Sequence, residues 1–181
     1  MNQQTEEIIK KVAKEPMKYL SKNPELTSNK KFMLKVCELN GLALRYASEE
    51  LKNTQEIVLA AVEKEGLALQ YASKEMQDKE AVVLAAVKSR ATALKYASDS
   101  RKKDRDIVLS AVENDARAFE YALGGLNHDE DFMLEAVQCN GMALMYASET
   151  IQDNEKVVLA AILQNKNALQ FISERLKNSV E

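Results

Sequence analysis

The sequence predicts an all-α fold, an α-solenoid of about six 25-residue helix-pair repeats behind an N-terminal cap-like helix pair. Aromatic residues keep the 25-residue step: Tyr46, Tyr71, Tyr96, Tyr121, Tyr146 and Phe171. Leucine keeps it too: Leu34, Leu59, Leu84, Leu109, Leu134 and Leu159. Gly (5) and Pro (2) are scarce, and the helix formers Ala, Leu, Glu and Lys dominate. A fixed period of this size is typical of stacked repeats.

The first 27 residues resemble a degenerate repeat. Ile8, Ile9 and Val12 imitate the first helix of a repeat, residues 17–21 imitate its second helix, and Pro16 lies at the turn between them. Terminal repeats of solenoids are expected to be atypical and polar on their outer side. We therefore expect residues 1–27 to form a cap, followed by six repeats over residues 28–181 in one continuous domain.

Each repeat should open with a helix of about eleven residues, seen most clearly over residues 54–64. Six consecutive apolar residues, 57–62, make it apolar nearly all round, so we expect it to be the inner, buried layer. Side-chain oxygens just before a helix accept from its free backbone N–H groups. The expected N-caps are Ser28, Asn53, Asp78 and Asp153, with Asp104 and Asp129 where the slot holds Lys103 or His128.

The second helix of each repeat is predicted to be amphipathic and to follow after one to three residues. The expected N-caps of this helix are Asn40, Asp115, Asn140 and Asn165. Its exposed slot holds Arg45, Gln70, Lys95, Glu120, Met145 and Gln170. Glycine in a helix interior costs about 1 kcal/mol relative to alanine. In the fourth repeat, Gly124 and Gly125 should therefore end the second helix early.

The repeat resembles the bacterial family catalogued as domain of unknown function 4116. VLAAV, an Asn/Glu-Gly turn, an AL-x-YAS helix and an acidic linker carry the resemblance over roughly residues 29–178. Examples are IVLAAVEKEGLALQYASKEM and FMLEAVQCNGMALMYASETI. The resemblance implies a helical interaction module in tandem, without an assigned chemistry. The third and fourth copies depart from it at Arg101 and at residues 123–125.

No motif for catalysis, a cofactor or a metal stands out, so we expect no enzyme and no cofactor. His128 is the sole histidine, and a capping or linker role is favoured over a general base because no motif ties a nucleophile to it. Asp129, Glu130 and Asp131 lack EF-hand spacing. As acids in a first helical turn they complement the helix dipole, which is favoured over a cation site.

The two cysteines are predicted to be too far apart for a disulfide. Cys37 and Cys139 lie about four repeats apart, and packed helices are spaced roughly 8–10 Å. Cys37 fills a slot that holds valine or isoleucine in other repeats, so it should be buried. Cys139 fills a variable slot and should be exposed.

Charge is spread unevenly along the chain. Residues 10–35, from Lys10 to Lys35, hold eight lysines and two acids, and residues 88–105 hold seven basic residues and two acids. Residues 106–155 hold eleven acids against Arg117 alone. The acidic block suggests a basic partner or a polar head-to-tail contact between copies. A solubilising acidic surface explains it equally well.

These observations predict a non-enzymatic scaffold that binds a protein or peptide partner through its exposed surface. The candidate partner-binding residues are Lys88, Arg90, Lys95, Arg101, Lys102, Lys103, Arg105, Arg117, Asp129, Glu130 and Asp131. The alternative is a nucleic-acid-binding module that uses the basic residues 10–35 and 88–105. Bases could stack on the row of tyrosines, although core filling is the favoured role of these rings. The net charge of −3 opposes this alternative.

A cytoplasmic location is expected. The polar, acidic N-terminus lacks the basic start and the apolar stretch of a secretory signal. The longest apolar runs fall far short of the roughly 20 residues that cross a bilayer, so no membrane partner is expected. Export by a specialised machine would leave no trace in these features, and that alternative stays open.

Overall fold

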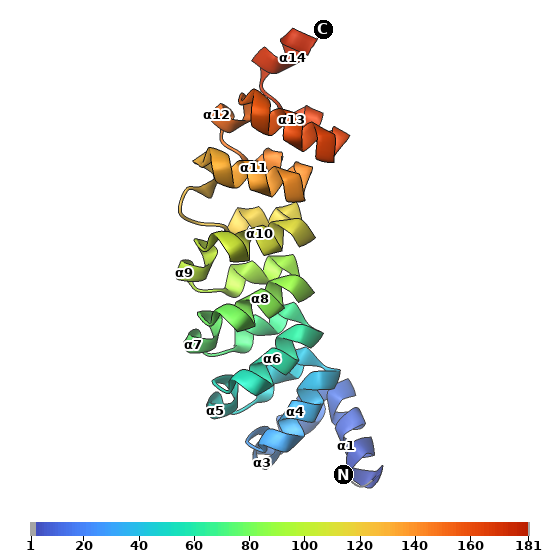
Figure 1. Ribbon diagram of the computed structural model, residues 1–181. Coiled ribbons are helices and arrows are strands. Elements are labelled where there is room, and N and C mark those ends of the chain that lie inside the picture. Colours follow the sequence, from blue (N-terminus) through green and yellow to red (C-terminus); the bar gives the residue numbers. More distant parts are fainter. Residues whose placement is uncertain (1–2, 181) are drawn as a thin grey trace. The chain divides into compact units, whose positions relative to one another are not determined.

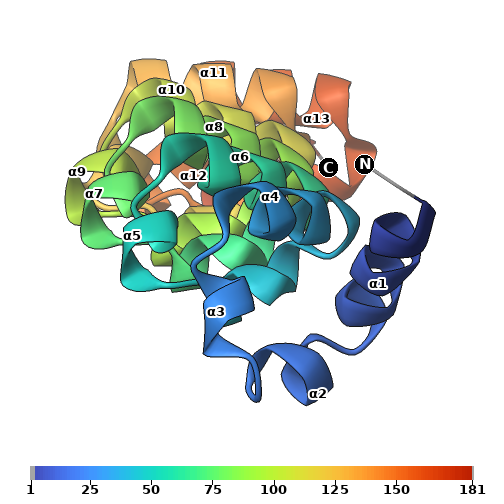
Figure 2. The same cartoon turned by 90° about the horizontal axis from the view of Figure 1, so that it is seen from below.

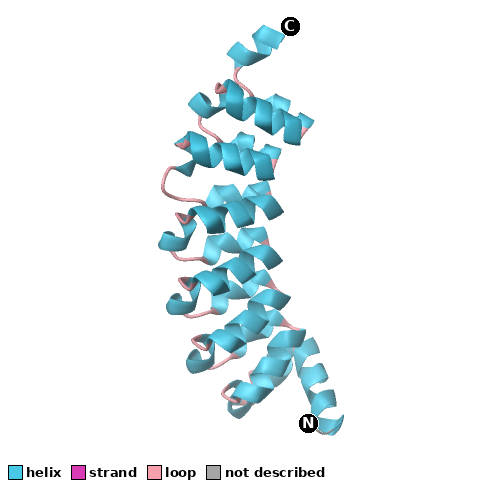
Figure 3. Ribbon diagram, viewed as in Figure 1, coloured by secondary structure: helices cyan, strands magenta, loops and turns pink. Residues whose placement is uncertain are grey.

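The computed structural model describes residues 3–180 of the 181-residue chain as short helices joined by short loops (Figures 1 and 3). No strand occurs among these residues, which confirms the all-α repeat prediction. The chain divides into two compact units, Met1–Ser98 (unit 1) and Asp99–Glu181 (unit 2). The continuous domain expected over residues 28–181 stays a prediction.

Unit 1 consists of an N-terminal group of helices followed by repeats that share one pattern. A ten-residue α-helix leads through one residue into a six-residue 3-10 helix, and a four-residue α-helix follows in the first two repeats. The elements are α1 (Gln3–Lys14), α2 (Pro16–Leu20), α3 (Pro24–Thr27), α4 (Lys30–Leu39), η1 (Gly41–Tyr46), α5 (Glu49–Lys52), α6 (Gln55–Lys64), η2 (Gly66–Tyr71), α7 (Lys74–Gln77), α8 (Glu80–Ser89) and η3 (Ala91–Tyr96).

Two layers form unit 1. The helices α4, α6 and α8 pack in sequence as one layer, and η1, η2 and η3 pack in sequence as the other (Figure 1). The short helices α5 and α7 lie together at one side of the stack, away from α1 (Figure 2). Helix α1 packs on α4 and buries Ile9 and Val12. The Asn40 side-chain amide donates to the Ala13 carbonyl at 2.8 Å and ties α1 to the first repeat.

Unit 2 repeats the two-layer pattern. The helices α10, α11 and α13 form one layer, and η4, η6 and η7 form the other (Figure 1). The elements are α9 (Asp99–Lys102), α10 (Arg105–Asn114), η4 (Ala116–Tyr121), η5 (Leu126–His128), α11 (Glu130–Cys139), η6 (Gly141–Tyr146), α12 (Glu149–Gln152), α13 (Glu155–Gln164), η7 (Lys166–Phe171) and α14 (Glu174–Val180).

The second helix of the predicted pair is in fact two segments, a 3-10 helix and a four-residue α-helix. The break comes after the tyrosine that recurs every 25 residues. After Tyr46, for example, Ala47 and Ser48 adopt extended backbone angles. The Ser48 hydroxyl then accepts from the Leu51 N–H, and Ser73 accepts in the same way from Met76. These serines therefore act as N-caps of a new helix, which a pattern of apolar residues alone does not reveal.

The prediction that the first helix is an inner, buried layer was wrong. In α6 the residues Ile57, Val58, Ala61 and Val62 are fully buried on one side. Leu59 and Ala60 point the other way and are only half-buried. Because each unit is two layers thick, every ten-residue helix keeps one face toward solvent. The recurring leucine of this slot lies on that outward face.

The first-helix caps lie one residue later than predicted in most repeats. Asp104 and Asp129 are N-caps as expected, and their carboxylates accept from the N–H groups of Ile107 and Phe132. The other N-caps are Asn29, Thr54, Lys79 and Asn154. The expected residues have another role: Asn53, Asp78 and Asp153 accept hydroxyl hydrogen bonds from Ser73, Ser98 and Ser173 of the following repeat.

The caps predicted for the second helix are confirmed. The side-chain oxygens of Asn40, Asp115, Asn140 and Asn165 each accept from the backbone N–H two residues later. The glycines were predicted to end the second helix of the fourth repeat early, but η4 ends at Tyr121, the position at which the 3-10 helices of the other repeats also end. The difference lies in the segment that follows, because residues 122–125 lie outside helices and the three-residue η5 takes the place of the four-residue α-helix. Gly124 (φ 83°) and Gly125 (φ 71°) take left-handed conformations that favour glycine.

Successive repeats are joined by a backbone hydrogen bond that recurs every 25 residues. The Ser73 N–H donates to the Lys52 carbonyl at 3.0 Å, and the Ser148 N–H donates to the Asn127 carbonyl at 2.9 Å. Where leucine replaces serine, the Leu123 N–H still donates to Lys102 at 2.9 Å. This contact needs no particular side chain, so the repeat geometry survives variation at the surface.

Candidate functional site

The sequence-predicted residues of unit 1 do not form one cluster. Arg90 pairs across repeats with Glu65, with Nε and Oε1 3.1 Å apart. The Lys95 ammonium lies 5.9 Å from the centre of the Tyr96 ring. Lys88 lies on the outward side of α8 and lines a hollow between α6 and α8. Of these three, Lys88 is the one that the structure places in a concave surface.

In unit 2, Arg105 and Asp129 are brought together. Their Nη1 and Oδ2 atoms lie 2.6 Å apart, and the guanidinium carbon lies 5.0 Å from the centre of the Phe132 ring. The Phe132 N–H and the Arg105 side chain both hold the pKa of Asp129 below its ordinary value. The contact joins α10 to the start of α11, and we interpret it as a tie between repeats.

The remaining predicted residues of unit 2 lie apart from that contact or within other ion pairs. Arg101 pairs with Asp104 at 3.1 Å, Lys102 with Asp99 at 3.8 Å, Arg117 with Asp115 at 2.7 Å and Glu130 with Lys156 at 3.7 Å. Hydrogen bonding from Arg117 lowers the pKa of Asp115. Lys103 is exposed with its stem beside Gly124, and Asp131 is exposed on α11. These residues therefore form no single binding cluster.

A surface that sequence reasoning missed lies on the outward side of α4, α6 and α8. A hollow of about 520 Å³ between α4 and α6 is lined by Leu34, Leu59, Ala60 and Glu56 among others. A second hollow, of about 500 Å³, lies between α6 and α8 and is lined by Ala81, Leu84, Ala85, Lys88 and Ser89. Glu63 borders both hollows. We call this surface the leucine face of unit 1.

A signal in the sequence could have found this face. Residues 57, 58, 61 and 62 share one side of a helix, and residues 59 and 60 fall on the other side at 3.6 residues per turn. The leucines at the outward position, Leu34, Leu59 and Leu84, are half-buried. An apolar residue that recurs on the solvent side of a helix is therefore the signal in the sequence that would have located this face.

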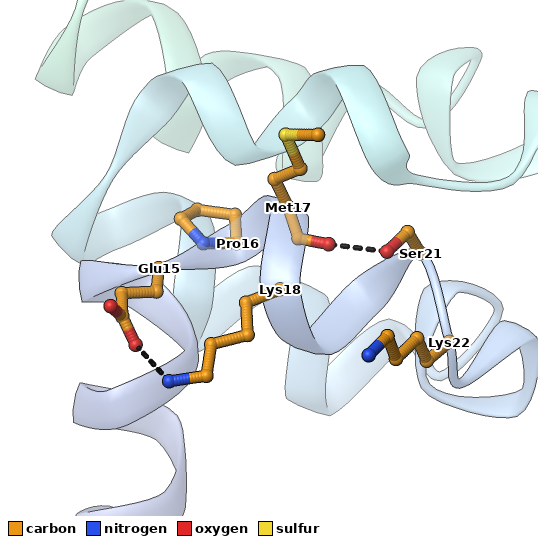
Figure 4. Close-up of a pocket in the computed structure, with 6 residues that line it drawn as sticks. All are labelled: Glu15, Pro16, Met17, Lys18, Ser21 and Lys22. Carbon is orange, nitrogen blue, oxygen red and sulfur yellow. Dashed lines mark hydrogen bonds and ion pairs between the residues drawn. The ribbon is translucent and has the colours of Figure 1, made fainter.

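A smaller hollow, of about 380 Å³, lies beside α2 near the start of unit 1 (Figure 4). Met17 projects into it with 72% of its surface exposed. Lys18 pairs with Glu15 at 3.0 Å, and the Ser21 hydroxyl donates to the Met17 carbonyl. The residues that line it are Glu15, Pro16, Met17, Lys18, Ser21 and Lys22.

The recurring tyrosines are half-buried at the surface of the 3-10 layer. Charged and aromatic neighbours lie against several ring faces. The Arg45 guanidinium lies 6.0 Å from the Tyr46 ring and 5.9 Å from the Tyr71 ring. Phe119 stacks on Tyr146 at 5.9 Å with 6° between the ring planes. Core filling therefore describes these rings only in part, and their faces already have partners from the protein.

The residues that could suggest chemistry are dispersed. His128 is exposed at the end of η5. Over residues 3–180, no three His, Cys, Asp or Glu side chains gather closely enough to hold a metal ion. Both cysteines are free thiols: Cys139 is exposed, and burial raises the pKa of Cys37 to about 12. Within the same described residues, no helix is long and apolar enough to cross a membrane.

Together these features define an all-α tandem-repeat protein. The chain belongs to the family described as Domain of unknown function (DUF4116), whose model matches residues 29–77, 80–123 and 129–177. Each match spans two of the 25-residue repeats. No curated protein and no solved structure matches the chain.

Proposed function

We propose that this repeat scaffold binds a protein or peptide partner, and that the leucine face of unit 1 is the contact surface. The observation that supports the proposal is the row of Leu34, Leu59 and Leu84, which stay half-exposed while the opposite side of each helix is fully buried. Their hydrophobic burial is completed only when another molecule covers them.

The two hollows fit this role in shape and chemistry. Their floors are leucine and alanine, and Glu56, Glu63 and Lys88 stand at their edges. An apolar floor with a few charged groups at the rim is the usual make-up of a peptide-binding groove. Neighbouring helices lie roughly 8–10 Å apart, so two hollows accept two apolar side chains from one partner segment.

Nucleic-acid binding is the weaker alternative, because many of the basic residues it needs already form ion pairs within the chain. Phosphate binding gains its free energy when lysine and arginine replace counterions. In residues 88–105, the side chains of Arg90, Arg101 and Arg105 each pair with a carboxylate of this chain. In residues 10–35, Lys18, Lys30 and Lys35 do the same. A phosphate would have to break these pairs.

Site-specific photo-crosslinking with the full chain tests the proposal in the cells that make the protein. A photoreactive phenylalanine analogue in place of Leu59 should give an adduct with a discrete protein. The same analogue in place of Lys95, which is exposed on the 3-10 layer, is the matched control. The Leu84→Glu change should abolish the adduct from position 59.

Protein adducts of equal yield from both positions, or no protein adduct from position 59, would contradict the proposal. An adduct that is removed by nuclease would favour the nucleic-acid alternative instead.

A further inference from the structure

One arginine of unit 1 differs from the other five in the chain, because it has no carboxylate partner. The five that form ion pairs with an Asp or Glu of the chain are Arg90, Arg101, Arg105, Arg117 and Arg175. Among the described residues, the guanidinium of Arg45 forms no ion pair and no hydrogen bond. A guanidinium has five N–H donors and no acceptor. Those of Arg45 are therefore available to another molecule.

Two tyrosine rings fix where this guanidinium lies. Its carbon is 6.0 Å from the centre of the Tyr46 ring and 5.9 Å from the centre of the Tyr71 ring. Arg45 therefore bridges η1 and η2, which pack against each other. A cation–π contact uses the face of a ring and leaves its hydroxyl available. Within residues 3–180, neither of these two hydroxyls forms a hydrogen bond with the protein.

The equivalent contact in unit 2 contains a carboxylate. Glu120 stands immediately before Tyr121, as Arg45 stands before Tyr46. The Glu120 carboxylate accepts from the hydroxyl of Tyr146, the tyrosine of the following repeat, at 3.4 Å. In unit 1 the residue at this position is a cation, so the chain supplies no such carboxylate there. A carboxylate from another molecule can take this place, and it would meet a guanidinium as well as a tyrosine hydroxyl.

The surroundings of Arg45 hold no acid that is paired with it. The 3-10 helices η1, η2 and η3 contain no Asp or Glu. In α5, which follows η1, Glu49 pairs with Lys52 at 2.8 Å, and the described structure has no ion pair at Glu50. Glu65, just before η2, pairs with an arginine of the next repeat. The 3-10 layer around Arg45 is therefore positive and complements an acidic ligand.

We propose that Arg45, Tyr46 and Tyr71 bind a carboxylate of a partner protein, from a glutamate or aspartate that has apolar neighbours. The two oxygens of a carboxylate match the fork of N–H groups on a guanidinium. The tyrosine hydroxyls donate to the same oxygens. Leu42 lies one 3-10 turn before Arg45 on the same side of η1 and is 43% exposed, so it contacts the apolar neighbour.

The contacts of Arg45 favour an acidic peptide over a nucleic acid. Bases bind single-stranded sites by stacking on open aromatic rings, and the guanidinium already lies against both tyrosine rings. The site is on the 3-10 layer, so it is separate from the leucine face and does not depend on it. Lys95 lies two repeats further along, roughly two helix spacings of 8–10 Å away, and takes no part in this site.

An NMR titration of the full chain tests the proposal, because the Nε–Hε group of each arginine gives its own signal. The probe is an acetylated, amidated five-residue peptide that alternates leucine and glutamate. The control peptide carries glutamine in place of glutamate. We expect the glutamate peptide to shift the Arg45 signal saturably, with a Kd of about 1 mM or tighter. The glutamine peptide should leave this signal in place, and the signal of the paired Arg90 should move little.

Three variants locate the contact. Arg45→Gln installs the residue found at the same position of the next repeat, Gln70, and should abolish saturable binding as seen in the backbone signals of η1 and η2. Tyr71→Phe keeps the ring, removes the hydroxyl and should weaken binding about threefold or more. Leu42→Gln should weaken it to a similar extent. Its matched control is Leu39→Gln, which removes a leucine that is 47% exposed on α4 beside α1, and should bind like the unchanged protein.

The proposal is overturned if the Arg45 signal does not move, if both peptides move it equally, or if Arg45→Gln leaves the affinity unchanged. Equal shifts of all six arginine signals would overturn it too, because they show nonspecific attraction of the peptide to positive charge. So would an equal loss in the Leu42→Gln and Leu39→Gln variants. If an oligonucleotide of eight thymidines shifts the Arg45 signal at lower concentration than the glutamate peptide, a nucleic acid is the occupant and the proposal is wrong.

Discussion

The outward helix faces of the two units share a row of leucines but differ in charge. In unit 1, helices α4, α6 and α8 carry four acids and five lysines. In unit 2, helices α10, α11 and α13 carry six acids and two basic residues. Among the residues described, the buried side chains are apolar in both units except for Gln77 of unit 1. The repeat therefore keeps its packing constant and varies the side chains that it exposes to solvent.

The largest effect should come from the shared packing. Phe132 in α11 and Val82 in α8 occupy the same repeat position, and both are fully buried. Phe132 also meets Phe119 edge to face at 6.0 Å between ring centres. We expect Phe132→Ala to lower the free energy of unfolding by about 3–5 kcal/mol and Val82→Ala by about 2 kcal/mol.

Urea denaturation followed by circular dichroism measures both losses. If Phe132→Ala cost no more than the exposed Leu39→Gln change, the contrast between a constant core and a variable surface would fail.

An intermediate loss of stability is expected when the glutamine that donates to carbonyls at the end of a 3-10 helix is removed, and the loss should differ between the two units. In unit 1, the buried Gln77 side chain donates to the carbonyls of Leu69 at 3.1 Å and Ala72 at 3.2 Å. In unit 2, the half-buried Gln152 donates to Leu144 at 3.1 Å. The Leu69 carbonyl also accepts from the Ala72 N–H, so Gln77→Ala removes one of two donors from Leu69 and the side-chain donor from the Ala72 carbonyl, and it should cost about 1–3 kcal/mol. Gln152→Ala should cost less in the same urea titration, and a larger loss at Gln152 would contradict this ranking.

Much of the fold could be predicted from the sequence because the period repeats local signals. Caps such as Asn40 and Asp115 depend only on residues two positions away, and Cys37 is fully buried in its valine slot as expected. The outward direction of Leu59 was not foreseen, because a run of apolar residues does not say that only one side of the helix is covered.

The candidate site was harder to predict than the fold. Arg90 was expected to meet a partner, yet it pairs with Glu65, which lies 25 residues away. That pairing depends on which repeats stack together and on the rotamers of long side chains. A comparison of each charged residue with the residue 25 positions away predicts this ion pair. It would leave the apolar residues on the outward side as the stronger candidates for a contact surface.

The smallest expected effect concerns the N-cap position, which differs in chemistry between the units. In unit 1, Asn29 accepts from the Phe32 N–H at 3.0 Å, but Thr54 and Lys79 make no side-chain cap hydrogen bond. In unit 2, the cap Asp129 is charged and accepts from Phe132 at 2.9 Å. The hydrogen bond from the Phe132 N–H and, to a smaller extent, the hydrogen bond and charge of Arg105 lower the pKa of Asp129 below its ordinary value. A carboxyl whose pKa is lower in the folded state stabilises the fold at neutral pH, and that stability is lost as the pH falls through the folded pKa.

Asp129→Asn keeps a good capping residue but removes the charge that faces Arg105. We therefore expect the variant to be slightly less stable than the unchanged protein at neutral pH, and the gap to close at a strongly acidic pH below the lowered pKa, where the aspartate gains a proton. Urea titrations of both proteins at the two pH values measure the gap. A gap of the same size at both values would show that the carboxylate adds nothing beyond its cap, and that the acids of unit 2 differ from the polar caps of unit 1 only in charge.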